Sequence, residues 1–213
     1  MQEFRLKDND IIKFIPLQDK NIEKQFSFAD IVYLELTREC NLRCSHCLNS
    51  SGKLMENQLN DKDFKKLIQD LSNAGIQEIR FTGGEPLKFN KIYDLIELAN
   101  NNGLCTSLGT NGTLITKEVA NRLKKVGLKK AVVSIDGTEE RHDSIRGNGN
   151  YKKAMNALYN LINAEIDVRV NAVIMKSNMN DVINLAKELN DKKIRLFIRR
   201  FIESGCKWTL FTK

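Results

Sequence analysis

The sequence predicts an α/β fold, a partial (β/α)6 TIM-like barrel with the last helix missing. Six apolar runs have the length and pattern of β-strands, and five segments between them have the 3.6-residue period of amphipathic helices. Strict alternation of this kind is typical of parallel strands joined by right-handed helical crossovers. A chain of 213 residues is long enough for one domain with a sizeable core.

The expected elements follow one another in order along the chain. Strands are expected at 31–37, 78–82, 105–110, 130–135, 167–175 and 194–201, and helices at 61–74, 90–101, 116–126, 151–164 and 180–191. Capping residues support two of the helices. Asn60 or Asp61 can cap the first helix and Gly75 can end it, while Thr116 opens the third and Gly127 closes it.

Three segments make up the predicted domain organisation. Residues 1–30 are an N-terminal extension with a short edge strand that Pro16 ends, residues 31–202 are the core domain, and residues 203–213 are a short C-terminal tail. The tail is too short for a sixth helix. We therefore expect that the chain is truncated or that a partner completes the barrel.

Charge and composition narrow the classes of protein that this chain can be. The net charge is +7, but the basic residues fall in scattered pairs with acidic residues between them, which is typical of solvated helix faces. Nucleic acid is therefore not an expected partner. No secretory signal and no apolar run of about 20 residues is visible, so we expect a cytoplasmic protein without a membrane span.

Three of the five cysteines are clustered directly after the first expected strand. Cys40, Cys44 and Cys47 belong to the run Cys-Asn-Leu-Arg-Cys-Ser-His-Cys at 40–47, which indicates metal chemistry in a reducing compartment. Three thiolates without a fourth can hold a [4Fe-4S] cube that leaves one iron open. On spacing alone, a structural zinc site is an equal alternative.

The ligand count favours the iron–sulfur interpretation. A closed zinc site needs four ligands, and the other cysteines, Cys105 and Cys206, stand far from the run. His46 lies between Ser45 and Cys47, where it would be a cramped ligand. His142 is expected to cap a local turn, with no catalytic role.

Unusual residues also follow the next three expected strands. These groups are Gly83-Gly84-Glu85-Pro86, the Thr-Asn-Gly-Thr sequence at 110–113, and Ser134-Ile135-Asp136-Gly137. Singly, each can be a turn or a cap, although paired glycines also admit a ligand close to the backbone, with Glu85 beside them as a charged acceptor. Because β/α barrels assemble their sites at the carboxyl ends of the strands, the four groups together predict one site.

Taken together, these motifs resemble the radical S-adenosylmethionine (SAM) enzymes. The cysteine run followed by Gly83 to Pro86 carries the resemblance, which extends through 134–137, His-Asp-Ser-Ile-Arg-Gly at 142–147 and 170–174, so that it covers about 33–201. The branch that it is most similar to contains peptide-modifying maturases, sulfatase maturases and the molybdenum-cofactor GTP cyclase. These relatives usually carry further cysteines after the barrel, and here only Cys206 lies there, so auxiliary clusters are not expected.

The resemblance implies a reaction and its cofactors. Cys40, Cys44 and Cys47 would hold a [4Fe-4S] cluster whose fourth iron binds S-adenosylmethionine, and reductive cleavage would form a 5′-deoxyadenosyl radical. That radical would abstract hydrogen from a peptide or protein side chain, with flavodoxin or ferredoxin as reductant. The alternative is a truncated, non-catalytic relative that binds the cluster, S-adenosylmethionine or a partner without turnover.

The resemblance also assigns expected contacts to S-adenosylmethionine. Backbone oxygens of Gly83, Gly84 and Glu85 would meet its amino group, and Arg146 would pair with its carboxylate. The remaining expected contacts are Ser134 and Asp136 near the ribose, His46 near the adenine, and Asn171 in the cavity wall.

Overall fold

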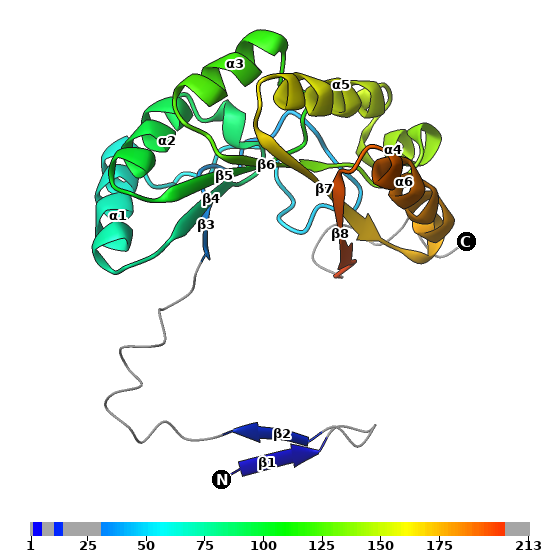
Figure 1. The fold of residues 1–213 in the computed structure, drawn as a ribbon, viewed down its shortest axis with the longest axis horizontal. Helices are drawn as coiled ribbons and strands as arrows, with labels where there is room; N and C mark the ends of the chain where they lie inside the picture. The colour runs from blue at the N-terminus through cyan, green and yellow to red at the C-terminus, as the bar shows by residue number, and fades with distance from the viewer. Residues whose placement is uncertain (1, 6–10, 15–30, 203–213) are drawn as a thin grey trace.

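A six-stranded parallel sheet forms the centre of the computed structural model, which describes residues 2–5, 11–14 and 31–202. Its strands are β3 (Ile31–Glu35), β4 (Glu78–Thr82), β5 (Cys105–Thr110), β6 (Lys130–Ser134), β7 (Asp167–Ile174) and β8 (Arg195–Arg200). They lie side by side in sequence order, with β3 and β8 at the two edges. The sheet curves into an open arch (Figure 1), so the predicted partial barrel is confirmed.

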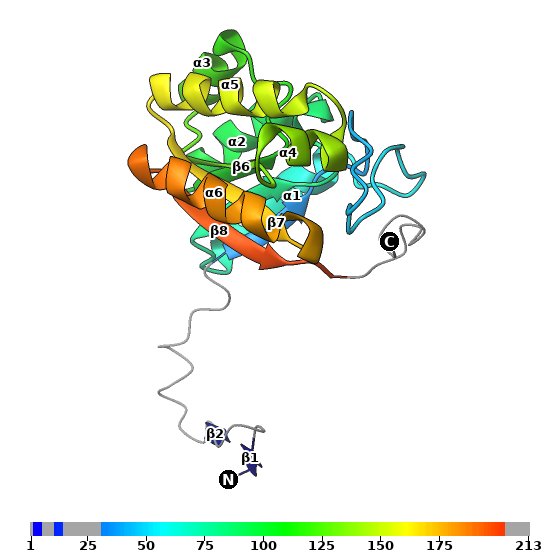
Figure 2. The same cartoon turned by 90° about the vertical axis from the view of Figure 1, so that its right-hand side faces the viewer.

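Six α-helices in the described part of the chain cover the convex side of this arch (Figures 1 and 2). They are α1 (Asp61–Asn73), α2 (Ile92–Asn101), α3 (Lys117–Lys125), α4 (Glu139–Arg146), α5 (Asn150–Asn163) and α6 (Met179–Asp191), with 3-10 turns η1 (Pro86–Lys88) and η2 (Lys176–Asn178). All five predicted helices are present. Helix α4 was not predicted, because its sequence is largely charged and only His142, Ile145 and Arg146 are buried.

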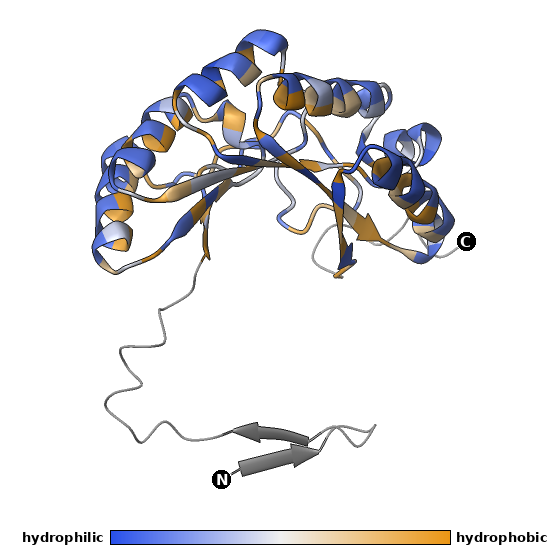
Figure 3. Cartoon of the chain, in the orientation of Figure 1, coloured by the Kyte–Doolittle hydropathy of each residue, from blue (hydrophilic) through white to orange (hydrophobic). Residues whose placement is uncertain are grey.

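The core lies between the sheet and the helices. On β4, Ile79 and Phe81 are fully buried, and α1 contributes Phe64 and Ile68 to the same core. Apolar residues accordingly gather on the helix faces that meet the sheet, with hydrophilic residues outside (Figure 3). This alternation on the strands and the helical period on α1 are the patterns that predicted the elements.

The predicted helix ends are confirmed at both helices. The Asn60 side chain accepts hydrogen bonds from Lys62 N and Asp63 N, and the Asp63 carboxylate accepts one from Asn60 N, so α1 begins with a capping box. Thr116 caps α3 by accepting from Val119 N. Gly75 and Gly127 follow these helices with φ of 83° and 89°, a left-handed conformation that favours glycine.

The other face of the sheet is polar. In β4, Glu78 and Arg80 alternate with the apolar core residues, and the residues paired with them on β5 are Cys105 and Ser107. Glu78 accepts hydrogen bonds from Ser107 Oγ at 2.8 Å and from Lys130 Nζ at 2.5 Å. On the concave side of the arch, the Glu78 carboxylate is therefore satisfied by residues of the neighbouring strands.

Parts of the predicted domain organisation fall outside the described residues. A short antiparallel pair, β1 (Gln2–Arg5) with β2 (Ile11–Phe14), lies within the expected extension, and β2 coincides with the predicted edge strand. Pro16, Cys206 and the tail 203–213 are outside the described part, so the three-segment division stays a prediction. In the described residues no helix is long and apolar enough to cross a membrane.

Replacing Glu78 with Gln should destabilise the fold by about 1–3 kcal/mol, because it leaves Lys130 without its carboxylate. Burial alone would raise the pKa of Glu78, but hydrogen bonds from Lys130 and Ser107 hold it below its usual value of 4.5. A depressed folded-state pKa stabilises the fold above about pH 4.5, and this contribution is lost as the pH falls through the lowered value. Urea unfolding from pH 7 to pH 3 measures both effects.

Asp70→Asn provides the control, since it removes an exposed ion pair with Lys66 on α1. It should leave the unfolding midpoint nearly unchanged. Equal midpoints for the Glu78 variant and the wild type at pH 7 would contradict the prediction.

Candidate functional site

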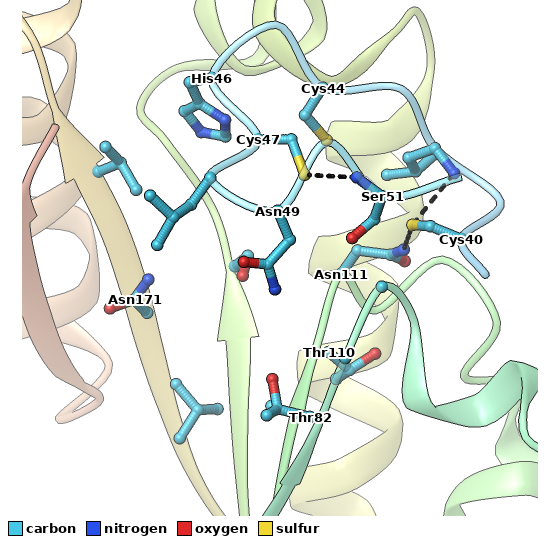
Figure 4. A pocket seen from close by; sticks show the side chains of 18 of the residues that line it. Cys40, Cys44, His46, Cys47, Asn49, Ser51, Thr82, Thr110, Asn111 and Asn171 are labelled. Atoms are coloured by element: carbon cyan, nitrogen blue, oxygen red, sulfur yellow. Dashed lines mark hydrogen bonds between the residues drawn. The ribbon is translucent and has the colours of Figure 1, made fainter. Parts of the chain in front are cut away.

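A cavity of about 300 Å³ opens at the carboxyl ends of the strands. The three clustered cysteines line one side of it, and residues of the strands and their following loops line the other (Figure 4). Among the predicted residues, the lining includes Cys40, Cys44, His46, Cys47, Gly83, Gly84, Ser134, Arg146 and Asn171. Nine of the eleven predicted site residues thus meet at one cavity, and Glu85 and Asp136 do not line it.

The cysteine loop follows β3 and closes on itself through its backbone. Glu39 and Gly52 form a parallel bridge, and Gly52 N donates to Arg38 O at 2.8 Å. Inside the loop, Cys47 N donates to Cys44 O at 3.2 Å. These bonds hold the three sulfurs on one short stretch of irregular backbone at the mouth of the barrel.

Each of the three sulfurs accepts a hydrogen bond from a nearby nitrogen. Leu42 N lies 3.4 Å from Cys40 Sγ, Ser51 N lies 3.4 Å from Cys47 Sγ, and Arg146 Nη1 lies 3.9 Å from Cys44 Sγ. Such donors stabilise thiolates, which are the form that binds metal.

Burial acts in the opposite direction on two of these thiols. It raises the pKa of Cys40 and of Cys44, against the lowering effect of the Leu42 amide and of the Arg146 guanidinium. The site thus combines three soft sulfur ligands, an N–H group at each sulfur and an adjoining cavity. This combination fits an iron–sulfur cluster with a bound ligand beside it. In the described part of the chain, no three His, Cys, Asp or Glu side chains are arranged to hold a single metal ion.

Gly83 and Gly84 are required by contact between two chain segments. A Cβ on Gly84 would lie 2.8 Å from Arg38 O and closer still to Glu39 O, and a Cβ on Gly83 would meet Thr37 O. The close approach allows Gly84 N to donate to Thr37 O at 2.6 Å. From the sequence, the paired glycines were interpreted as leaving room for a ligand. In the structure, their lack of side chains allows the segment after β4 to pack against the cysteine loop.

Glu85 braces the loop after β5. Its buried carboxylate accepts from Thr110 Oγ1 at 2.8 Å, Asn111 N at 2.8 Å and Leu87 N at 3.3 Å. Burial raises the pKa of Glu85 to about 7, although these donors oppose the shift. The sequence predicted this carboxylate to lie beside a ligand, but its oxygens accept hydrogen bonds from the protein itself. Through these bonds Glu85 positions Asn111, whose Nδ2 lies 3.8 Å from Cys40 Sγ.

Asp136 is likewise a buried junction behind the cavity wall. Its Oδ2 accepts from His46 Nε2 at 2.8 Å and from Arg146 Nε at 2.5 Å, while Oδ1 accepts from Val173 N at 2.8 Å. Burial alone would raise the pKa of Asp136, but the Arg146 charge and the hydrogen bonds from His46 and Arg146 hold it well below its usual value. Asp136 has no exposed surface, so its carboxylate oxygens make these three protein contacts, and its predicted place near the ribose stays a prediction.

The two partners of Asp136 both line the cavity. His46 donates through Nε2, which leaves Nδ1 buried without a hydrogen-bond partner in the described part. Arg146 uses Nε for Asp136 and directs Nη1 toward Cys44. Asp136 therefore orients a ring nitrogen acceptor and a guanidinium group at the cavity.

Ser134 and Asn171 lie side by side on β6 and β7, where they are paired in register. Figure 4 shows the Asn171 side chain directed at the cavity, and its Oδ1 is buried without a hydrogen-bond partner among the described residues. A buried acceptor of this kind needs a donor, because an unmade hydrogen bond is costly. The prediction that Asn171 lines the cavity agrees with its position.

Some site residues were not predicted as such. Asn111 was interpreted as part of a turn, and only the fold brings its amide to Cys40. His142 lies inside α4, where Nδ1 is 3.3 Å from Asp136 N, so it caps the turn that follows β6. Burial and the nearby Arg146 charge lower the pKa of His142 to about 4.

Comparison with known proteins identifies the family. The family model of the Radical SAM superfamily matches residues 34–189 of the chain. The chain belongs to the radical SAM superfamily. Among its curated relatives, Fe-coproporphyrin III synthase of Methanosarcina barkeri is 37% identical over 166 residues, which cover 77% of this chain and 42% of the relative. Mycofactocin maturase MftC of Mycobacterium tuberculosis is 35% identical over 173 residues, covering 80% and 44%.

Solved structures share the fold of this chain. SuiB of Streptococcus suis bound to S-adenosylmethionine superposes with a TM-score of 0.74 at 21% identity, covering 84% of this chain and 42% of SuiB. AnSMEcpe with bound S-adenosylmethionine gives a TM-score of 0.68 at 22% identity, covering 84% and 54%. The radical SAM chain described here spans about half the length of the relatives that it matches.

Gly84→Ala should displace the cysteine loop, because the new Cβ would press on Arg38 O and Glu39 O. We expect a loss of about 1–3 kcal/mol in the free energy of unfolding. We also expect a lower iron content after anaerobic reconstitution. Gly109→Ala is the matched control, since a Cβ there meets its nearest neighbour, Thr82 Oγ1, at an ordinary 3.7 Å. Equal behaviour of the two variants would refute the docking role of Gly84.

Asp136→Asn should cost about 3–5 kcal/mol of stability, since it leaves the buried Arg146 cation without a counter-charge. The amide nitrogen of Asn would also face two donors. Urea denaturation at pH 7 measures the loss, with the exposed Asp94→Asn as control. A loss no greater than that of the control would mean that the junction does not stabilise the site.

Proposed function

We propose that this chain cleaves S-adenosylmethionine reductively at a [4Fe-4S] cluster and abstracts hydrogen from a peptide or protein side chain. The observation that carries the proposal is the placement of Cys40, Cys44 and Cys47 on one cavity, each sulfur with an N–H donor. When bound, the cluster and S-adenosylmethionine would supply the electron and the 5′-deoxyadenosyl radical. The protein would bind, orient and shield them.

Several groups in the cavity suit the functional groups of S-adenosylmethionine. The backbone of Gly83 and Gly84 offers carbonyl oxygens for its ammonium group, and Arg146 offers a cation for its carboxylate. The unpartnered Asn171 Oδ1 is an acceptor for a hydroxyl, with Ser134 beside it. His46 Nδ1 is an acceptor suited to the exocyclic amine of adenine.

The proposed substrate class draws support from the relatives. MftC is named as a maturase, and SuiB has been solved bound to the precursor peptide SuiA. A reductant such as flavodoxin or ferredoxin belongs to the same proposal, because cleavage of this kind consumes an electron. The cytoplasm, which the sequence predicts, is a compartment that keeps thiols reduced.

The decisive experiment uses the purified chain, reconstituted anaerobically with iron and sulfide, reduced with dithionite and mixed with S-adenosylmethionine. We expect an iron–sulfur absorbance and formation of 5′-deoxyadenosine. Cys44→Ser should lose most of the cluster iron and the product. Cys105→Ser should retain both, because Cys105 lies on β5 outside the cavity.

Other outcomes discriminate between the alternatives. A protein that holds the cluster without forming 5′-deoxyadenosine is the non-catalytic relative. A colourless protein that retains zinc would contradict both interpretations.

A further inference from the structure

The cavity extends from the cysteines to three side chains on the concave face of the sheet, Tyr33, Arg80 and Arg199. They belong to β3, β4 and β8, so the two edge strands both contribute. Arg80 Nη1 donates to Tyr33 Oη at 2.9 Å, and Arg199 Nη2 donates to the same oxygen at 3.3 Å. Two cations from opposite parts of the arch thus converge on one phenol.

The ring of Tyr33 strengthens this arrangement. The guanidinium carbons of Arg80 and Arg199 lie 5.0 Å and 5.8 Å from the ring centroid. Arg80 is further held by a hydrogen bond from Nε to Ser107 Oγ at 3.1 Å. The position of Arg80 is therefore largely set by the protein, which lowers the entropic cost of binding a ligand there.

Negative charge on the concave face is too scarce to balance these cations. Glu78 is shared between Arg80 at 3.4 Å and Lys130 at 2.5 Å. Similarly, Asp167 is shared between Arg169 and Arg195.

Glu35 of β3 pairs with Arg38 of the cysteine loop, so its charge is also used elsewhere. Arg199 has no ion pair within the described residues, and Nε of Arg169 is buried there without a hydrogen-bond partner. The cavity end at Arg80 and Arg199 is accordingly short of an anion.

We propose that Tyr33, Arg80 and Arg199 bind a carboxylate of the substrate, and hence that the substrate is a carboxylic acid. The proposal rests on the proposed function, because it takes the cavity beside the cysteines as the place where the substrate reacts. Guanidinium groups suit carboxylates, since their planar N–H groups match the two oxygens. The Tyr33 hydroxyl accepts from both arginines and keeps its own proton to donate.

The carboxylate can come from a peptide or from a non-peptide acid, and the test separates the two sources. The reconstituted protein with S-adenosylmethionine is titrated calorimetrically with acetyl-Gly-Glu-Gly-amide, with its Gln counterpart and with glutarate. We expect saturable binding of the Glu peptide that weakens with salt, and binding of the Gln peptide about tenfold weaker. Glutarate binding as tightly as the Glu peptide indicates a non-peptide acid, and weaker glutarate binding indicates a peptide.

Arg199→Gln should weaken binding of the favoured carboxylate probe about tenfold and leave the Gln peptide unaffected. Arg195→Gln is the matched control, because Arg195 lies on the same strand and face but outside the cavity lining. It should bind the probe within about twofold of wild type. Tyr33→Phe, which keeps the ring and removes the hydroxyl, should give a loss of about threefold to tenfold.

Three results would overturn the proposal: equal binding of the Glu and Gln peptides without binding of glutarate, equal losses in the Arg199 and Arg195 variants, or no saturable binding of either carboxylate. Stronger binding of inorganic phosphate than of both carboxylates would also overturn it. Formation of 5′-deoxyadenosine by the wild type is measured separately. If the wild type forms 5′-deoxyadenosine but does not prefer carboxylates, only this inference is overturned. If it prefers carboxylates but forms no 5′-deoxyadenosine, only the proposed function is overturned.

Discussion

The carboxylate of Asp136 joins three segments that are distant in sequence, and the shape of the candidate site depends on them meeting. It holds His46 of the cysteine loop, Arg146 at the end of α4 and the backbone of Val173 at the end of β7. Burial of a charge is tolerated here because the pairing is complete, with two N–H donors from side chains and one from the backbone. Without this junction, the histidine and the guanidinium group would lose the orientation that directs them at the cavity.

A second constraint is the close approach of β4 to the cysteine loop. Gly83 and Gly84 allow backbone hydrogen bonds to Thr37 and Glu39 that any side chain would obstruct. Glu85 then carries the contact onward to the loop after β5, which positions Asn111 at Cys40. Buried hydrogen bonds of residues 83–85 thus connect β4, the loop after β5 and the Cys40 sulfur. The polar atoms of this motif therefore stabilise the fold around the candidate site.

The concave face combines this scaffold with a separate electrostatic feature. Cations outnumber their carboxylate partners there, and the two that face the cavity converge on Tyr33. A proposed radical site at one end of the cavity and an anion site at the other would define the direction in which a substrate lies. The chain belongs to the radical SAM superfamily, and the charge pattern on its concave face is read from its own residues.

Alternation of apolar strands and amphipathic helices was sufficient to predict the open barrel, because period and burial are local properties of the sequence. The same applies to the caps at Asn60 and Thr116, and to the cysteine run with its associated loops at the carboxyl ends of the strands. Sequence could not reveal α4, whose charged surface hides its three buried residues, or the buried roles of Glu85 and Asp136. Only the tertiary structure decided those roles, because whether a carboxylate faces a ligand or the protein depends on donors that arrive from segments many residues away.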